Sequence, residues 1–414
     1  MLATCLGCGC ACDDIQLRVE ANLIREARHA CALGEQWFGD GAVPSRTLVD
    51  GRDAAVDDAL DIAAALLRRA ARPLVYLAPD ISCEAQRAAI ALADLLHATI
   101  DSITSATTLR AMLASQEIGR ASATLGEIRN RADVVVFWGV DPSRRYPRFW
   151  TRYAPEPSGT HVDGRRDRIV IAVDVGSARG PEDADQRVAV MADREVSLLA
   201  ELTSLIARPN DGVAVPPAVE AILRAKYVAL VADAEPDDTE RRDEGRSSAL
   251  TAFAQALNGP TRCAHIVLRG GGNRSGADAC LTAQTGYPTA VDFSRGHPRY
   301  RPHDHAAARI DRGRVDAAAI VGSASRIPLP LARLTHVPTI IIGPRATAIE
   351  VPVRVAVDTG VAGIHESGTA VRMDDVPLPL AGAIAGPPAA AEIVAALTRR
   401  VASTAVARVG GNRQ

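Results

Sequence analysis

The segments ADVVVFWGVDP (132–142) and DRIVIAVDVG (167–176) decide the fold of this chain. Each is a short run that is apolar almost throughout. Such runs are expected for strands of a parallel sheet that helices cover on both faces. The two segments therefore predict a doubly wound α/β architecture.

The alternation of strand and helix continues on both sides of these two segments. Further strands are predicted at 73–79, 264–270, 288–294, 315–322, 338–343 and 351–357, and helices at 83–98 and 194–207. RPNDGVAVPPA (208–218) contains three prolines and is typical of a linker, whereas 234–248 reads as a charged surface loop. We therefore expect two α/β units, with 1–50 as a separate cysteine-rich lobe.

Length and composition narrow the class of protein. A chain of 414 residues exceeds one ordinary domain, and 47% hydrophobic residues can build a large core. The net charge of −2 argues against a dedicated nucleic-acid binder. No apolar run reaches the roughly 18 residues that span a bilayer, and the N-terminus lacks a secretory pattern. We therefore expect a cytoplasmic protein without a membrane partner.

Four of the eight cysteines lie in the first twelve residues. The spacing Cys5-x2-Cys8-x3-Cys12, followed by Cys31, is typical of thiolate ligands to an iron–sulfur cluster or another metal. In a reducing compartment, metal binding is favoured over disulfides. An iron–sulfur cluster, zinc and an empty set all stay open, and Cys10 lies outside the set.

The other cysteines, Cys83, Cys263 and Cys280, lie singly in apolar or helical contexts. Free cysteine is one of the most frequently buried residue types. Ordinary burial is therefore the prediction for each of the three.

The loop Gly270, Gly271, Gly272 and Asn273 joins a predicted strand to a helix that is expected to begin near Ser275. Backbone N–H groups of a glycine-rich loop at a helix N-terminus suit a phosphate. The loop lacks the full dinucleotide fingerprint, so a tight strand–helix turn is an equal alternative.

Two further segments combine basic and aromatic or histidine side chains. In HPRYRPHDH (297–305), His303 and His305 lack a third ligand nearby, and a solvated basic loop is favoured over a metal site. The segment 138–157 places Arg144, Arg145 and Arg148 among aromatic side chains at the carboxyl end of a strand. A phosphate or polycarboxylate ligand and an interface between protein chains both fit it, and the interface is slightly favoured.

Several long strings together resemble the B subunit of formylmethanofuran dehydrogenase, a family of the molybdopterin oxidoreductase superfamily. They are CLGCGCACDD with the later Cys31, ATLGEIRNRADVVVFWGVDPSRRYPRFWTRY (123–153), RGGGNRSG with TGYPTAVDFSRGHPRYRP (285–302), and GIHESGTAVRMDDVPLPL (363–380). The resemblance implies two Rossmann-like units, one inserted in the other. The implied boundaries are a lobe at 1–50, an α/β domain at 51–103 and 213–385, an inserted domain at 104–212, and a C-terminal helix and tail at 386–414.

The dehydrogenase form of this family carries a [4Fe–4S] cluster at its N-terminal cysteines, here Cys5, Cys8, Cys12 and Cys31. It also carries tungsten or molybdenum on two pterin dinucleotides, for which Gly270–Asn273 is a degenerate loop. The metal-ligating cysteine should fall near Thr104, but 101–119 contains no cysteine. The resemblance therefore implies a [4Fe–4S] cluster or no cofactor, without the tungsten or molybdenum pterin; oxygen ligation by Ser102, Thr104 or Ser105 is the alternative.

The chain looks like the bacterial form of this B subunit, found in the formyltransferase/hydrolase complex of methylotrophs. That complex transfers a formyl group between tetrahydromethanopterin and methanofuran and hydrolyses it to formate, in one-carbon metabolism from formaldehyde to formate. The implied partners are the other members of the complex: an amidohydrolase-like A subunit, a C subunit and a formyltransferase D subunit. The implied role of this chain is structural and not catalytic, and the alternative is an active tungsten or molybdenum dehydrogenase. A third hypothesis is that Arg144, Arg145, Arg148 and Arg299 hold the polyglutamate tail of a methanofuran-type cofactor.

Overall fold

A computed structural model of the chain describes residues 1–207, 215–234, 244–324 and 327–410. The chain divides into two compact units. Unit 1 comprises Met1–Thr107, Gly271–Arg372 and Pro377–Gln414, and unit 2 comprises Thr108–Gly270 and Met373–Val376. Unit 2 is therefore inserted into unit 1, as the sequence predicts for the topology, and each unit is described by itself below.

Unit 1 is built on a nine-stranded sheet in the order β14-β13-β7-β6-β15-β16-β17-β4-β5. Strands β7, β6, β15, β16 and β17 run parallel, and both edges are antiparallel. The strands are β4 (Thr47–Val49), β5 (Arg52–Asp53), β6 (Pro73–Leu77), β7 (Thr99–Ser102), β13 (Val291–Asp292), β14 (Arg299–Tyr300), β15 (Ala317–Val321), β16 (Thr339–Gly343) and β17 (Val355–Asp358). The chain order reverses between β6 and β15, which makes their carboxyl ends the topological switch point of this unit.

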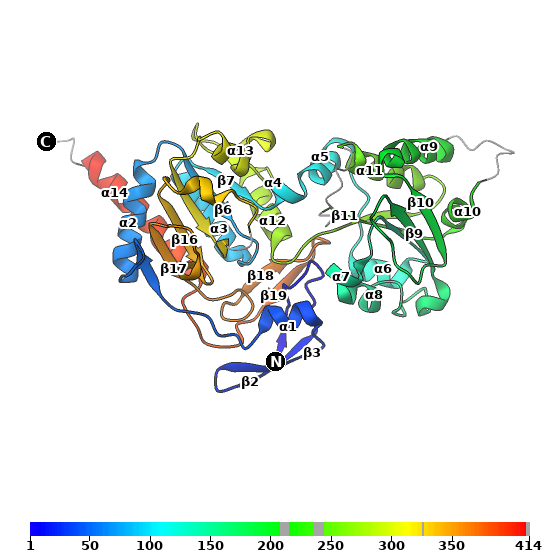
Figure 1. Ribbon diagram of the computed structural model, residues 1–414, viewed down its shortest axis with the longest axis horizontal. Helices are drawn as coiled ribbons and strands as arrows, with labels where there is room; N and C mark the ends of the chain where they lie inside the picture. The colour runs from blue at the N-terminus through cyan, green and yellow to red at the C-terminus, as the bar shows by residue number, and fades with distance from the viewer. Residues whose placement is uncertain (208–214, 235–243, 325–326, 411–414) are drawn as a thin grey trace. The chain divides into compact units, whose positions relative to one another are not determined.

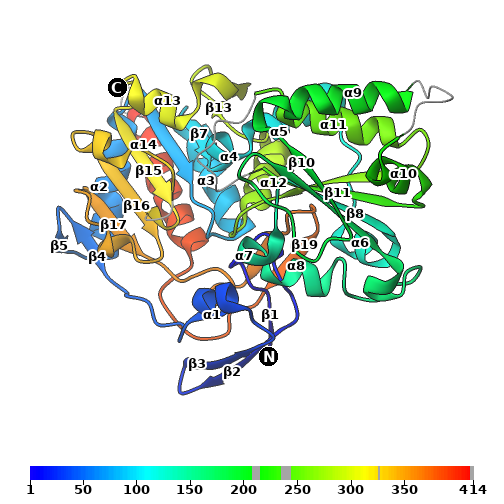
Figure 2. The same cartoon turned by 45° about the vertical axis from the view of Figure 1, so that its right-hand side comes forward.

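Apolar side chains on both faces of this sheet account for its near-continuous hydrophobic strands. One face packs against α2 (Val56–Arg69), α3 (Cys83–Leu95), α12 (Arg274–Thr285) and α14 (Ala390–Gly410), and Figures 1 and 2 show α3 and α14 lying along it. The other face packs against α13 (Ala306–Asp311) and short 3-10 turns. The short helix α4 (Thr104–Thr107) follows β7.

The cysteine-rich lobe belongs to unit 1 but has its own sheet. Its elements are β1 (Leu2–Ala3), β2 (Ile15–Glu20), β3 (Leu23–Arg28) and α1 (Ala32–Phe38), and the three strands pair antiparallel. The hairpin of β18 (Gly368–Val371) and β19 (Pro377–Leu380) contacts the lobe, since the Thr4 hydroxyl donates to the Pro379 carbonyl at 2.7 Å.

Unit 2 holds a five-stranded, fully parallel sheet in the order β10-β9-β8-β11-β12. Its strands are β8 (Val134–Trp138), β9 (Ile169–Val175), β10 (Gln186–Val190), β11 (Val228–Asp233) and β12 (Cys263–Leu268). Its helices are α5 (Leu109–Ile118), α6 (Leu125–Arg131), α7 (Pro142–Arg145), α8 (Pro147–Arg152), α9 (Glu195–Ala207), α10 (Pro217–Arg224) and α11 (Arg246–Leu257). The switch point of this unit lies between β8 and β11, because the chain order reverses there.

The doubly wound α/β fold that the sequence predicts is confirmed, but the implied domain boundaries differ from the observed ones: unit 2 begins at Thr108 and also includes Met373–Val376. The inserted unit does not end at 212; it continues to Gly270, since β11 pairs with β8 and β12 pairs with β11. The predicted linker 208–218 is also shorter than expected, because α10 begins at Pro217. Residues 208–214 of it, and 235–243 of the predicted charged loop, lie outside the described residues.

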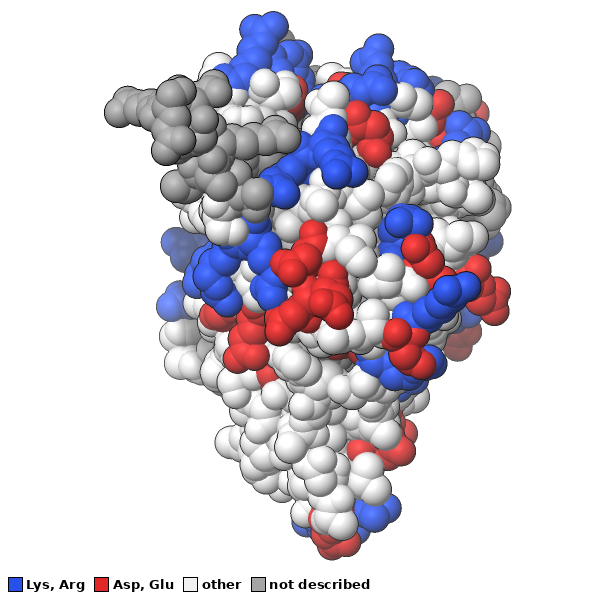
Figure 3. Space-filling view, turned by 90° about the vertical axis from the view of Figure 1, so that its left-hand side faces the viewer, with Lys and Arg blue, Asp and Glu red and all other residues white. Residues whose placement is uncertain are grey.

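The surface shown in Figure 3 carries acidic and basic side chains interspersed over the same face. This distribution agrees with the small net charge of −2. Within the described residues, no helix combines the length and apolar character that crossing a bilayer requires.

Candidate functional site

The four cysteines of the predicted metal set come together in the N-terminal lobe. The Cys5 thiol lies within electrostatic reach of Cys8, Cys12 and Cys31, and the Cys5 backbone N–H donates to the Cys12 carbonyl at 2.9 Å. Cys5, Cys8 and Cys12 are buried, and Cys31 is half-buried as the N-cap residue of α1. The chain reversal at residues 5–12 and the start of α1 therefore bring the set together.

Burial raises the pKa of the Cys5 thiol, and the neighbouring thiols raise it further. Two glycines leave room around the Cys5 sulfur: a Cβ on Gly7 or Gly34 would lie 3.4 or 3.3 Å from it. A bound metal would relieve the raised pKa, because coordination deprotonates a thiol outright.

Among the residues that the structure describes, no three His, Cys, Asp or Glu side chains are placed to hold a single metal ion. An iron–sulfur cluster and zinc both stay predictions for the four cysteines, and the two would differ in the spacing of the sulfur atoms.

Cys10 is outside the predicted metal set in sequence spacing, but it lies next to Cys8 of that set in the structure. Its side chain is fully buried, and its thiol is hydrogen-bonded to the sulfur of Cys8. This contact raises the pKa of Cys10 well above its usual value. Cys10 therefore lies against the cysteine set as a buried neighbour of Cys8.

The glycine loop is a tight strand–helix turn that the protein itself fills. The Gly272 N–H donates to the Leu6 carbonyl at 2.8 Å, and the Asn273 N–H donates to the Pro79 carbonyl at 2.5 Å. Gly272 has φ +88°, and a Cβ there would lie 2.3 Å from the Pro79 carbonyl oxygen. Of the two readings of Gly270–Asn273, these contacts favour the turn, because two of its N–H groups are already used.

The position expected for the metal thiolate is occupied by a buried polar network. The Thr104 hydroxyl donates to the Asp278 carboxylate at 2.6 Å, and both side chains are buried. The Ser105 hydroxyl donates to Asp101 at 2.5 Å, and the Ser102 hydroxyl oxygen accepts from the Thr104 N–H at 3.3 Å. A hydroxyl must lose its proton to act as a strong metal ligand, whereas the Thr104 hydroxyl keeps its proton in the hydrogen bond that it donates to Asp278.

The arginine segment that follows β8 lies at the switch point of unit 2. Arg145 forms an ion pair at 2.7 Å with Asp233, the last residue of β11, and its guanidinium lies over the Tyr146 ring. Arg144 is exposed on α7, and Arg148 is half-buried on α8.

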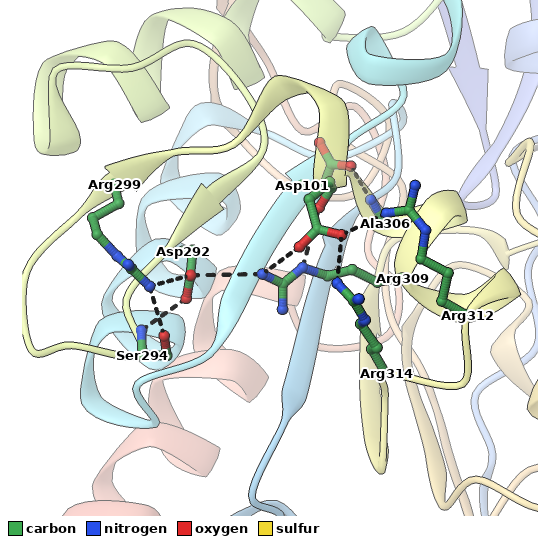
Figure 4. A network of polar contacts seen from close by, with 9 residues as sticks. Asp101, Asp292, Ser294, Arg299, Ala306, Arg309, Arg312 and Arg314 are labelled. Atoms are coloured by element: carbon green, nitrogen blue, oxygen red, sulfur yellow. Dashed lines mark hydrogen bonds and ion pairs between the residues drawn. The ribbon is translucent and has the colours of Figure 1, made fainter.

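Arg299 belongs to unit 1, so the structure does not bring it together with the other three arginines inside one unit. Figure 4 shows Arg299 and Arg309 directed at Asp292, with Arg299 at 2.5 Å and Arg309 at 3.6 Å. Arg145 and Arg299 are thus each neutralised by a carboxylate of their own unit. The predicted loop 297–305 is only partly a loop, because it contains β14 and a 3-10 helix at Pro302–Asp304; His303 lies in that 3-10 helix and His305 is the N-cap residue of α13.

A cavity of about 320 Å³ lies at the switch point of unit 1, and sequence reasoning missed it. Asp80 and Ser323 follow β6 and β15, and the Ser323 N–H donates to the Asp80 carboxylate at 2.8 Å. Trp37 of α1 also lines it, and its indole N–H is buried without a hydrogen-bond partner. The sequence signal was the position of Asp80 after a buried strand.

His265 in β12 is a second residue that sequence reasoning passed over. It is buried, and neither ring nitrogen has a hydrogen-bond partner. Burial lowers the pKa of His265 to about 3, and the nearby charges of Arg120 and Arg246 lower it further. The imidazole is therefore neutral in the folded protein.

This depressed pKa predicts acid lability of unit 2. The unfolded chain takes up a proton at His265 near pH 6.5, whereas the folded chain does so only near pH 3. Stability from this residue is therefore full above about pH 6.5 and falls by about 2 kcal/mol between pH 7 and pH 5. Urea unfolding of a His265→Leu variant should lack this part of the pH dependence. Ile266→Val, on the same strand, should shift the curve equally at every pH, and a wild-type slope in His265→Leu would contradict the prediction.

Comparison with known proteins agrees with this architecture. The chain is 32% identical over 399 residues to the B subunit of tungsten-containing formylmethanofuran dehydrogenase 2 from Methanocaldococcus jannaschii, covering 91% of this chain and 92% of the relative. It is 31% identical to the protein of the same name from Methanococcus maripaludis, covering 96% and 97%. No family model matches the chain.

Among solved structures, the fold resembles a chain of the formyltransferase/hydrolase complex (FhcABCD) from Methylorubrum extorquens, crystallised with methylofuran. The TM-score is 0.71 at 24% identity, and the match covers 87% of this chain and 99% of the other.

The chain has two α/β units with parallel strands, one unit inserted in the other, and a lobe with four clustered cysteines. This architecture defines a protein of the Rossmann-like α/β class. The sequence matches then identify the family, because they cover 91% and 96% of the chain at 32% and 31% identity. The chain belongs to the family of formylmethanofuran dehydrogenase B subunits.

Proposed function

We propose that this chain is the non-redox B subunit of a formyltransferase/hydrolase complex in methanofuran- and tetrahydromethanopterin-linked one-carbon metabolism. It would have a structural role, and its partners would be an amidohydrolase-like A subunit, a C subunit and a formyltransferase D subunit. The solved complex with a similar fold, which contains methylofuran, supports these partners and a methanofuran-type ligand.

The hydrogen bond between Thr104 and Asp278 carries this proposal. It lies where the family's dehydrogenases would place the metal thiolate, and the sequence holds no cysteine between Cys83 and Cys263. The side chains present do not fit a tungsten or molybdenum pterin, because the hydroxyl proton is committed to a carboxylate and the glycine loop is filled by Leu6 and Pro79.

The four clustered cysteines do fit an iron–sulfur cluster, and we include a [4Fe–4S] cluster in the proposal. Cys5, Cys8, Cys12 and Cys31 would be its ligands. In this chain the cluster would tie the start of α1 to the N-terminal reversal, as a structural metal does.

The relatives named as tungsten-containing dehydrogenases favour a second candidate, an active redox protein. The two candidate functions differ in whether electrons pass from the substrate to an acceptor, which only the redox protein would do. The complex, purified anaerobically, should release formate from a formylated methanofuran-type substrate without reducing a viologen dye. Dye reduction by two electrons for each formyl group or formate oxidised to carbon dioxide would establish the redox candidate instead.

Metal content gives a second, independent test on the same complex. We expect about four iron and four sulfide per chain, with broad visible absorption, and no stoichiometric tungsten or molybdenum. Cys5→Ser should lose most of the iron, whereas Cys10→Ser should keep it. Stoichiometric tungsten or molybdenum with pterin would overturn the structural role. Iron-free complex would overturn only the cluster.

A further inference from the structure

Two cysteines that the sequence treats as isolated are neighbours in unit 1. Cys83 is the first residue of α3, and Cys280 lies in α12, 197 residues later in the chain. The Cys280 thiol donates to the Cys83 carbonyl oxygen at 3.7 Å, and its one proton lies within reach of the Cys83 sulfur as well. The prediction that both are buried is confirmed, and their proximity is a further finding that the sequence did not show.

The surroundings of Cys83 favour its thiolate. The hydrogen bond from Cys280 is the largest cause that lowers the pKa of Cys83 to about 7, against the effect of burial. The Asn273 amide donates to the Cys83 sulfur at 3.4 Å, and the sulfur lies at the N-terminal end of a 13-residue helix. Arg87, exposed one turn further along α3, favours the thiolate, and Glu84 opposes it.

The partner thiol is held in the opposite state. Donation to Cys83 raises the pKa of Cys280 well above its usual value, and burial adds to this. The pair therefore combines a nucleophilic thiolate with a protonated thiol within hydrogen-bond distance. Redox-sensitive cysteines combine a low-pKa thiolate with a resolving thiol and access for the oxidant, and here a small peroxide has to reach a pair that is 2% and 5% exposed.

We propose that Cys83 and Cys280 form a reversible disulfide when the protein meets a hydroperoxide. The Cys83 thiolate attacks the peroxide oxygen, the O–O bond breaks, and the Cys83 sulfenic acid forms as the leaving oxygen takes a proton to become water or an alcohol. The Cys280 sulfur then attacks the Cys83 sulfur, and the hydroxyl leaves as water with the Cys280 proton. The two sulfurs lose two electrons, which the peroxide gains, and a dithiol reductant restores both thiols by exchange.

The disulfide would join α3 to α12 at the base of the glycine turn. The same Asn273 side chain that donates to Cys83 also donates to the Ile81 carbonyl at 3.0 Å and accepts from the Val371 N–H at 2.8 Å. A disulfide sulfur is a weaker acceptor than a thiolate, so oxidation loosens one contact of this residue. Cys83 and Cys280 lie far in sequence from the predicted metal set Cys5, Cys8, Cys12 and Cys31. The proposed disulfide therefore does not depend on whether that set binds a cluster.

Peptide mapping of the full chain tests the proposal directly. Trypsin releases Cys83 in a peptide that ends at Arg87 and Cys280 in one that ends at Arg295, so the N-terminal cysteines do not interfere. The folded protein is treated with hydrogen peroxide, blocked with N-ethylmaleimide, then unfolded and digested. We expect the linked peptide pair in most molecules, two hydrogen masses lighter than the sum of its parts, and its disappearance after dithiothreitol.

Single variants separate the two chemical steps. In Cys280→Ser, dimedone should trap the sulfenic acid on Cys83, whereas in Cys83→Ser the Cys280 thiol should stay reduced. Cys263 is the matched control, since burial in β12 raises its pKa to about 12, and it should remain unmodified. Circular dichroism verifies that each variant folds.

Three outcomes would overturn the proposal. They are two fully alkylated peptides after peroxide, Cys83 over-oxidised without the linked pair in the wild-type chain, or a cross-link that forms only in urea.

Discussion

Replacing Asp101 by alanine should lower the free energy of unfolding of unit 1 by about 4 kcal/mol. The carboxylate is buried at the end of β7, and Figure 4 shows it beside Ala306. It accepts hydrogen bonds at 2.5–3.1 Å from five donors: the N–H groups of Ser102, Ala290 and Ala306 and the hydroxyls of Ser105 and Thr289. Alanine would leave the three buried N–H groups without this acceptor, whereas the Ser105 and Thr289 hydroxyls, 2.7 Å apart, still have each other. The loss of the three N–H acceptors is why the cost exceeds that of an ordinary substitution.

Asparagine at this position should give an intermediate and local effect. Its amide oxygen can replace Oδ1, which takes four of the donors, but its NH₂ group would face the Ala306 N–H that Oδ2 now accepts at 2.7 Å. We expect a loss of about 2 kcal/mol. Amide hydrogen exchange should accelerate more at the start of α13 than at Ala290.

The measurement is urea unfolding combined with hydrogen exchange of β7 and α13, so that unit 1 is followed separately from unit 2. Asp53→Ala is the control, because this exposed carboxylate of β5 has only the surface ion pair with Arg46. It should cost less than about 0.5 kcal/mol. Equal losses in Asp101→Ala and Asp53→Ala would show that the buried donors find water or other acceptors.

The strands could be predicted because their signal is local. The apolar runs at 73–79, 132–142 and 167–176 became β6, β8 and β9. Assignment of strands to sheets could not be predicted in the same way. YVALVAD (227–233) was not recognised as a strand, and once β11 is missing, β12 has no visible link to β8. Parallel strands look alike in sequence, and pairing depends on the long-range packing of helices between them.

In the candidate site, too, local features could be predicted from the sequence and long-range contacts could not. The N-terminal cysteine set was visible because its members are close in sequence, and the lost thiolate was visible from the resemblance. Asp278, which holds the Thr104 hydroxyl, lies 174 residues away, and Cys280 lies 197 residues from Cys83. Neither contact leaves a local pattern, since each depends on how α12 packs against β7 and α3.

Replacing Glu195 by alanine should destabilise unit 2 by about 3–5 kcal/mol. Its side chain is buried at the start of α9, where it accepts from the Arg246 guanidinium at 2.8 Å and from the Trp138 indole at 2.8 Å. Arg246, the first residue of α11, is buried as well. Removal of Glu195 takes from the buried Arg246 guanidinium its ion-pair partner at 2.8 Å, and the loss of this contact in the interior dominates the cost.

Glu201→Ala provides a matched control on the same helix. Glu201 pairs with Arg194 at 3.3 Å, but both side chains are exposed, so the loss should stay below about 0.5 kcal/mol. The double variant Glu195→Leu/Arg246→Met should lose less than the sum of the two single variants, because no buried charge is then left unpaired. Urea unfolding followed by tryptophan fluorescence and by hydrogen exchange of β8 and β11 measures each of these variants against the wild-type chain. Additive losses in the double variant would mean that Glu195 and Arg246 are stabilised independently, the carboxylate by the Trp138 indole and the guanidinium by the carbonyls of Trp138 and Asp233 at 3.4 Å.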